Sequence, residues 1–229
     1  MTEASAPKTT SRAAADRRAA VRDFKRQAIL QAAKRVFGAR GLDGASMRAI
    51  AAEAGYTVGA LYGYYAAKEH IYADILSDSL AALATAIKAA IAGAERAAPA
   101  GGDDTGAAAR AAAFAFYAYY RAQPDELDLS FYLLRGIGPR GLTPELDRHL
   151  NGRLIAALRP ISVAIARLGA LNEAAAATET VAAACHMSGV LLLERSGRLK
   201  VLGHEGGALV GRYLEDMAAR LGGGTGERA

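Results

Sequence analysis

The chain of 229 residues contains no tryptophan and a single cysteine, Cys185. One cysteine cannot form a disulfide within the chain, so a disulfide-stabilised secreted fold is excluded. No apolar run approaches the roughly 20 residues that cross a bilayer, and the N-terminus has no apolar signal core. We therefore expect a cytoplasmic protein that has no membrane partner.

Motifs of enzyme chemistry are also missing. The four histidines are scattered, and no HExxH, CxxC, GxSxG or P-loop pattern occurs. Cys185 and His186 are neighbours, so on a helix their side chains would point about 100° apart, which is a poor arrangement for a nucleophile and its base. We expect no catalytic residues, no metal and no cofactor.

The composition that remains favours helices. Alanine is very abundant and β-branched residues are sparse, and the chain is long enough to bury a sizeable core. The pattern predicts an all-α fold of about nine helices. An N-terminal domain of three helices would be followed by a larger helical domain.

Positive charge is concentrated at the N-terminal end. Residues 1–70 hold 12 Lys or Arg and six Asp or Glu, a net charge of +6, whereas residues 71–229 hold 16 and 17, a net charge of −1. A basic end favours a polyanionic partner such as DNA, although a basic tail alone also serves solubility.

The segment from Ser46 to Lys68 has the pattern of a helix-turn-helix. Ser46 is a good N-cap, Gly55 suits a helix end, and Thr57 can cap a second helix that contains Leu61. Two short helices joined in this way place the second in the major groove of DNA. An ordinary helical hairpin is the alternative, and capping with core spacing favours the helix-turn-helix.

Residues 24–76 resemble the DNA-binding domain of the tetracycline-repressor (TetR) family. The matching positions are Ile29, Ala32, Ala33, Phe37, Gly41, Ser46, Ile50, Ala51, Ala54, Gly55, Thr57, Gly59, Leu61, Tyr62, Tyr64, Tyr65, Lys68, Glu69 and Leu76. The resemblance implies a transcriptional regulator that binds a palindromic operator in double-stranded DNA as a dimer. It also implies a C-terminal domain that binds a small effector.

Four segments are expected along the chain. They are a disordered basic arm (1–15), the helix-turn-helix domain (16–67), a ligand-binding and dimerisation domain (68–222) and a flexible tail (223–229). The first helix is expected from about Asp16 to Ala39, with Phe24 on its packed face, and a long fourth helix from Lys68 would link the two domains. The arm either solubilises the protein or lies along DNA.

The resemblance implies eight DNA-contacting residues. Thr57, Tyr62, Tyr64 and Lys68 are the expected phosphate partners, although Tyr64 is equally a core candidate. Val58, Gly59 and Ala60 would face the bases and carry no group for bidentate hydrogen bonds. Our hypothesis is that Arg48 supplies the main guanine contact.

The rest of the chain predicts two further sites. By resemblance, the two C-terminal helices form the homodimer interface; the alternative is intramolecular core. The predicted pocket for an apolar or aromatic effector of unknown identity contains Tyr117, Tyr120, Phe131, Tyr132, Arg135 and His186. Core packing is the alternative for each of them. A helical interaction module without specific DNA binding is the alternative function, and repressor and activator are not distinguished.

Overall fold

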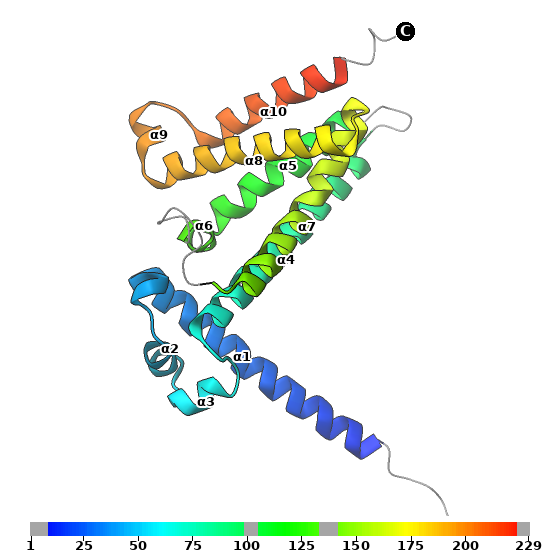
Figure 1. Cartoon of the computed structure of the whole chain (residues 1–229). Helices are drawn as coiled ribbons and strands as arrows, with labels where there is room; N and C mark the ends of the chain where they lie inside the picture. Colours follow the sequence, from blue (N-terminus) through cyan, green and yellow to red (C-terminus); the bar gives the residue numbers. More distant parts are fainter. Residues whose placement is uncertain (1–8, 99–104, 133–141, 224–229) are drawn as a thin grey trace, which may run out of the picture. The chain divides into compact units, whose positions relative to one another are not determined.

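The computed structural model describes residues 9–98, 105–132 and 142–223, and every regular element in these ranges is a helix (Figure 1). The helices are α1 (Thr9–Gly44), α2 (Met47–Ala54), α3 (Val58–Tyr62), α4 (Lys68–Ala97), α5 (Thr105–Ala122), α6 (Pro124–Tyr132), α7 (Pro144–Gly169), α8 (Glu173–Arg195), α9 (Arg198–Val201) and α10 (Gly206–Gly222). The all-α class is confirmed, and the described residues contain one helix more than the expected nine. The addition is α9, whose four residues are too few to show a periodic pattern.

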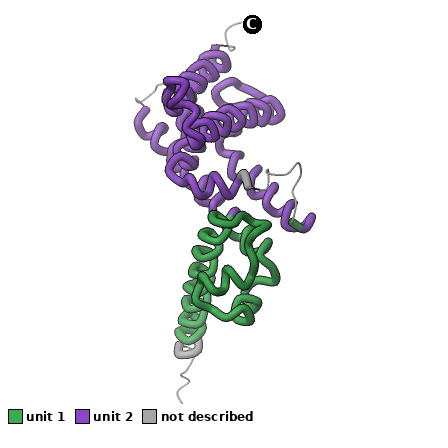
Figure 2. Tube along the Cα trace, turned by 90° about the vertical axis from the view of Figure 1, so that its left-hand side faces the viewer, with its two compact units in different colours: residues 1–75, 132–142 green, residues 76–131, 143–229 purple. Residues whose placement is uncertain are grey.

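The chain divides into two compact units, and the division falls within α4 (Figure 2). The first unit comprises residues 1–75 and 132–142, and the second comprises residues 76–131 and 143–229. The sequence placed this boundary at Lys68, about two helical turns earlier. The start of α4 belongs to the first unit because Tyr72 is fully buried there, with its ring edge-on to Phe37 at 5.9 Å between centroids.

Helix α1 differs from the prediction at its N-terminal end. It begins at Thr9, so residues 9–15 are helical, whereas we expected disorder. Alanine and arginine, which favour helices, dominate this segment and explain the difference. Residues 1–8 of the predicted arm lie outside the described residues. Helical geometry is broken at Gly41 with φ of 75°, which confirms the expected end of the helix.

The predicted packing of Phe24 is wrong, because its side chain is 74% exposed. The buried face of α1 begins with Ile29 and continues through Phe37. Phe24 precedes Ile29 by five residues, which places the two about 140° apart around a helix. Phe24 therefore points away from the packed face.

Helices α2 and α3 form the predicted helix-turn-helix. Ser46 Oγ and Thr57 Oγ1 each accept a hydrogen bond from the backbone N–H three residues later, at 3.2 and 3.1 Å. Gly55 ends α2 in the left-handed region at φ of 73°. Helix α3 ends at Tyr62, so Tyr65 packs from the turn that follows it.

Helix α5 is the centre of the second unit. It packs closely against α7, α8 and α10, as Figure 1 also shows. Alanines at 109, 112 and 113 allow the close approach, and Phe116, Tyr117 and Tyr120 fill the core beside them. Thr143 caps the start of α7, since its Oγ1 accepts a hydrogen bond from the N–H of Leu146.

Helices α4 and α8 are long and apolar enough to cross a membrane by length and composition alone. No such segment was expected, because polar residues interrupt both of them. This is weak evidence for a membrane helix, since the core helices of water-soluble proteins pass the same test. Both helices contribute buried residues, such as Ile87 and Met187, to the core of the second unit.

Candidate nucleic-acid interface

The outward surface of α3 is small and uncharged. Gly59 and Ala60 are exposed, Val58 is half-buried, and Tyr62 is 55% exposed. Leu61 points the other way and is fully buried, which fixes the rotation of this short helix. Such a surface can approach base edges without desolvating a charge, and it offers methyl and ring contacts to them.

Arg48, Thr57 and Tyr64 are further predicted DNA contacts in the first unit. Arg48 is exposed in the first turn of α2, and it has no ion pair within the described residues. Thr57 is exposed, and its hydroxyl still has a proton to donate while its oxygen caps α3. Tyr64 is half-buried in the turn that follows α3. Their contacts with DNA remain predictions.

Lys68 is engaged inside the first unit. Its Nζ donates hydrogen bonds to the carbonyl oxygens of Leu42 at 2.7 Å, Ala45 at 3.0 Å and Asp43 at 3.4 Å. An ammonium group has three protons, so these bonds use all of them. Contact between this side chain and a phosphate therefore requires one of the three bonds to break. The backbone N–H groups at the start of α4 remain an alternative anion site.

Tyr65 holds the turn after α3 in place. Its hydroxyl donates a hydrogen bond of 2.8 Å to Asp74 Oδ2, and Asp74 also pairs with Arg26 of α1 at 3.1 Å. Burial first, and then the hydrogen bond to Asp74, raises the pKa of Tyr65 well above that of free tyrosine. The phenol therefore stays protonated and ties the end of α3 to α1 and α4.

The N-terminal half of α1 is a basic surface. Arg12, Arg17, Arg18, Arg22 and Lys25 are all exposed there, and no residue from Arg12 to Ala28 is fully buried. Figure 1 shows this half of the helix running beyond α2 and α3. The sequence predicted a disordered basic arm over residues 1–15, so it missed that a helix presents Arg12 together with the other cations.

The first unit matches a known family. Residues 29–75 match the family model of the bacterial regulatory proteins of the tetR family. The match begins at the first buried residue of α1 and ends where the first unit ends in α4. Over these residues the chain is similar to the DNA-binding domain of the tetR family. The capped helices α2 and α3 are thus the helix-turn-helix of a TetR-type DNA-binding domain. No curated protein matches the chain in sequence.

Solved structures extend the likeness over both units. A protein of Shewanella sp. PV-4 assigned to the tetR family is 21% identical, with a TM-score of 0.61, over 84% of this chain and 97% of that chain. The fatty acid degradation regulator FadR of Bacillus halodurans is 16% identical, with a TM-score of 0.61, over 89% and 97%. FadR of Bacillus subtilis, solved in complex with stearoyl-CoA, is 14% identical, with a TM-score of 0.63, over 84% and 97%. At these identities the likeness shows the TetR fold alone.

Three of the six residues predicted for an effector pocket have side chains that the structure describes, and these lie in packed parts of the second unit. Tyr117 and Tyr120 are buried in the core around α5, where the Tyr117 hydroxyl donates a hydrogen bond of 2.9 Å to Glu194 Oε2. His186 lies between α8 and α10 with its ring stacked on Tyr213 at 4.1 Å. Its Nε2 is buried without a hydrogen-bond partner among the described residues.

Three predicted pocket residues are not placed by the structure. Arg135 and the side chains of Phe131 and Tyr132 fall outside the described residues. The roles of all six residues in effector binding therefore stay predictions.

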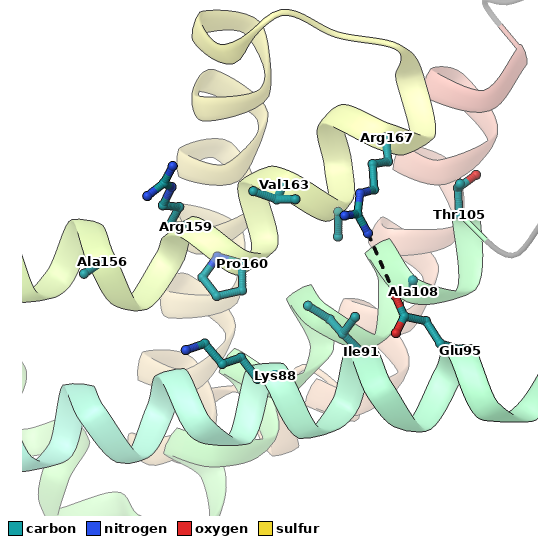
Figure 3. A pocket seen from close by; sticks show the side chains of 11 residues that line it. Lys88, Ile91, Glu95, Thr105, Ala108, Ala156, Arg159, Pro160, Val163 and Arg167 are labelled. Atoms are coloured by element: carbon teal, nitrogen blue, oxygen red, sulfur yellow. Dashed lines mark ion pairs between the residues drawn. The ribbon is translucent and has the colours of Figure 1, made fainter.

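A cavity of about 740 Å³ lies elsewhere in the second unit, between α4, α5 and α7 (Figure 3). Its lining residues are Lys88, Ile91, Glu95, Thr105, Ala108, Ala156, Arg159, Pro160, Val163, Ala164 and Arg167. Sequence reasoning missed this site. The available signal was Pro160 between two alanines, Ala156 and Ala164, which are too small to fill the space beside it.

Helix α8 presents an uncharged face to the outside. The exposed residues at helical spacing along it are Ala174, Thr178, Val181, Cys185, Gly189 and Leu192. Val181 is 57% and Leu192 45% exposed. A Cβ atom added at Gly189 would meet no atom within 4 Å, so no other part of the described chain requires a glycine there. This face is the part of α8 best suited to contact a second copy of the chain.

Proposed function

We propose that this protein is a ligand-responsive transcriptional repressor that binds a palindromic operator as a homodimer and is released by a small effector with an apolar or aromatic body. The observation that carries the proposal is the exposed, uncharged surface of capped α3 beside exposed Arg48. The charge of +6 on residues 1–70 supports a phosphate-rich partner.

Operator contact would be divided between two kinds of residue. The α3 surface supplies apolar contacts to thymine methyl groups, and Arg48 supplies a bidentate contact to guanine. Thr57, Tyr62 and Tyr64 supply phosphate contacts. A single DNA-binding domain makes few contacts with DNA. Tight binding therefore requires two copies of the protein on half-sites roughly 34–36 Å apart.

The uncharged face of α8 supports dimerisation through the two C-terminal helices. An apolar face of this length on a water-soluble helix marks a protein–protein contact. Small residues on the face, such as Ala174 and Gly189, would let the partner helix approach closely. In this arrangement Cys185 would lie within the interface.

Effector response would pass through α4, which contributes residues to both units. The FadR structure with stearoyl-CoA supports an effector site in a helical body of this fold. An effector shifts DNA affinity only by its differential affinity for two conformations. We infer that the effector favours a position of α4 in which the two DNA-binding domains of the dimer no longer match the spacing of the operator half-sites.

The decisive experiment is a titration of the purified protein on its own upstream DNA at several salt concentrations, with and without a ligand library. A regulator binds one sequence in preference to others, and its affinity falls steeply with salt. Binding that is indifferent to sequence would favour a helical interaction module instead. A reporter gene under the same promoter distinguishes repression from activation.

A further inference from the structure

The cavity between α4, α5 and α7 combines an apolar floor with a cationic rim. Its apolar lining residues are Ile91, Ala108, Ala156, Pro160, Val163 and Ala164. Its ionisable lining residues are Lys88, Glu95, Arg159 and Arg167. Three cations against one carboxylate give the cavity a net positive charge. Its volume of about 740 Å³ falls within the range of small-molecule sites, roughly 300–1,000 Å³.

Among the residues that the structure describes, only one of the three cations has a partner. Arg167 Nη1 lies 3.9 Å from Glu95 Oε1, and this pair spans one end of the cavity (Figure 3). Lys88 and Arg159 have neither an ion pair nor a hydrogen bond from their charged groups to the described residues. The Lys88 side chain extends from α4 towards α7 near Pro160 (Figure 3). The Arg159 side chain lies at the edge of the cavity, and its guanidinium group points away from α4. Two positive charges beside an apolar surface are therefore left unmatched.

The cavity lies where α7 contains a proline and the backbone of α4 stands away from those of its neighbours. Pro160 has no N–H, so the carbonyl oxygen of Ala156, four residues earlier, lacks its helical donor. The close helix pairings of the second unit join α5, α7, α8 and α10, whereas α4 reaches them through longer side chains such as Ile91. A molecule in this space would add contacts between α4 and α7 to those that the chain already makes at Ser77 and Glu95.

We propose that this cavity binds an amphiphile with one anionic head group, and that this molecule is the effector; the inference thus rests on the proposed function. Lys88 contacts the head, and Arg159, on a flexible stem at the rim, folds over it. The hydrocarbon or aromatic body lies over Ile91 and Val163. The unmatched charges favour an anion over a neutral ligand, and the floor favours an amphiphile over a small inorganic anion.

Binding at the site is tested without DNA. Dodecanoate, dodecyl phosphate and neutral dodecanol, each below its micellar concentration, are competed against 1-anilinonaphthalene-8-sulfonate and measured by fluorescence. We expect both anions to bind at least tenfold more tightly than dodecanol. Lys88→Gln with Arg159→Gln should weaken only the anions, by tenfold or more. Arg148→Gln, on α7 but outside the cavity lining, is the control.

A second variant locates the ligand. Ala156→Trp places a large side chain in the cavity and should abolish displacement by all three compounds. Equal binding of dodecanoate and dodecanol by the unmodified protein would overturn the proposal, and so would undiminished binding by Ala156→Trp. A preference for dodecyl phosphate over dodecanoate assigns a phosphate head, and the reverse assigns a carboxylate.

Coupling to DNA is measured separately on the protein–operator complex. Dodecanoate or dodecyl phosphate should reduce operator affinity at least tenfold for the unmodified protein, and less than twofold for the Lys88→Gln, Arg159→Gln variant. Failure of the ligand-free protein to select an operator would overturn the proposed function. Operator binding that is specific but unaffected by every anionic amphiphile would overturn this inference alone.

Discussion

The Lys68 ammonium donates a hydrogen bond of 2.7 Å to the carbonyl oxygen of Leu42, so the first residue of α4 closes the turn between α1 and α2. Ala45 accepts a second bond of 3.0 Å in the same turn. Lys68→Met should lower the free energy of unfolding of the protein by about 1–3 kcal/mol, because buried carbonyl oxygens lose a charged donor. Urea unfolding followed by circular dichroism measures this change.

DNA binding by the same variant separates a structural role from a phosphate contact. A lost phosphate contact lowers the slope of log affinity against log salt by about 0.9, whereas a purely structural role leaves the slope unchanged. We expect reduced stability with an unchanged slope. Full stability with a lower slope would show that Lys68 reaches DNA and that its bonds to the turn contribute little.

The exposed N-terminal half of α1 should add phosphate contacts to the interface. Arg17→Gln, Arg18→Gln and Arg22→Gln together remove three exposed charges and keep a good helix-forming residue at each position. We expect weaker operator binding and a salt slope lower by about 0.9 for each phosphate contact that is lost. An unchanged slope would show that this half of α1 makes no phosphate contact and serves solubility instead.

The control for that variant removes the same charge elsewhere. Arg148→Gln, Arg198→Gln and Lys200→Gln replace three exposed cations on α7 and α9 in the second unit. This control should change the slope of log affinity against log salt by less than about 0.9, the value expected for one phosphate contact. Equal effects of the two triple variants would point to net charge alone.

The first unit was predictable from sequence because its signals are local. A cap such as Ser46 and a left-handed glycine such as Gly55 act within one or two turns, so their spacing predicts their structure. The bonds of Lys68 to a turn more than 20 residues earlier depend on tertiary packing, so the sequence did not reveal them, and the family resemblance implied a phosphate contact instead.

The cavity was harder to predict for a related reason. Pro160 signals an interrupted helix, but the space beside it depends on which helices pack closely and which stand apart. The effector pocket was predicted from aromatic residues such as Tyr117 and Tyr120, which fill the core of the second unit. An aromatic residue at helical spacing is equally suited to packing and to ligand binding. Sequence periodicity does not separate these two uses.

Arg48 should carry base selectivity if it contacts guanine. Arg48→Ala is expected to cost about 1–3 kcal/mol of operator affinity and to relax selectivity at one base pair of each half-site. Affinities for a panel of operators with single substitutions measure both effects. The hypothesis fails if the ranking of operators is unchanged. Arg148→Ala, in the second unit, should alter neither.

The uncharged face of α8 should be an interface. Val181→Glu and Leu192→Glu each place a carboxylate on this face, and burial of an unpaired charge costs several kcal/mol. We expect the dimer dissociation constant to rise by roughly a hundredfold or more, as measured by sedimentation equilibrium. Far-UV circular dichroism should not change, since both side chains are exposed in one chain. Ala89→Glu, on an exposed position of α4, is the control.

Tyr117 should make the second unit sensitive to alkaline pH. Burial first, and then the hydrogen bond to the Glu194 carboxylate, raises the pKa of Tyr117 from 10.0 to about 12. The folded protein thus binds the phenolic proton more tightly than the unfolded chain does. The resulting stabilisation is fully present below pH 10 and is lost as the pH rises towards 12.

Tyr117→Phe removes both the hydrogen bond and the titration. Near pH 7 the variant should be less stable by about 1–3 kcal/mol, because Glu194 loses a donor. Between pH 10 and 12 the unmodified protein should lose about 2–3 kcal/mol more than the variant, since each pKa unit corresponds to about 1.4 kcal/mol. Urea midpoints at pH 8, 10 and 12 measure the difference, with Tyr62→Phe on the exposed surface as control. Parallel losses in the unmodified protein and Tyr117→Phe would show that the hydrogen bond to Glu194 does not link stability to this titration.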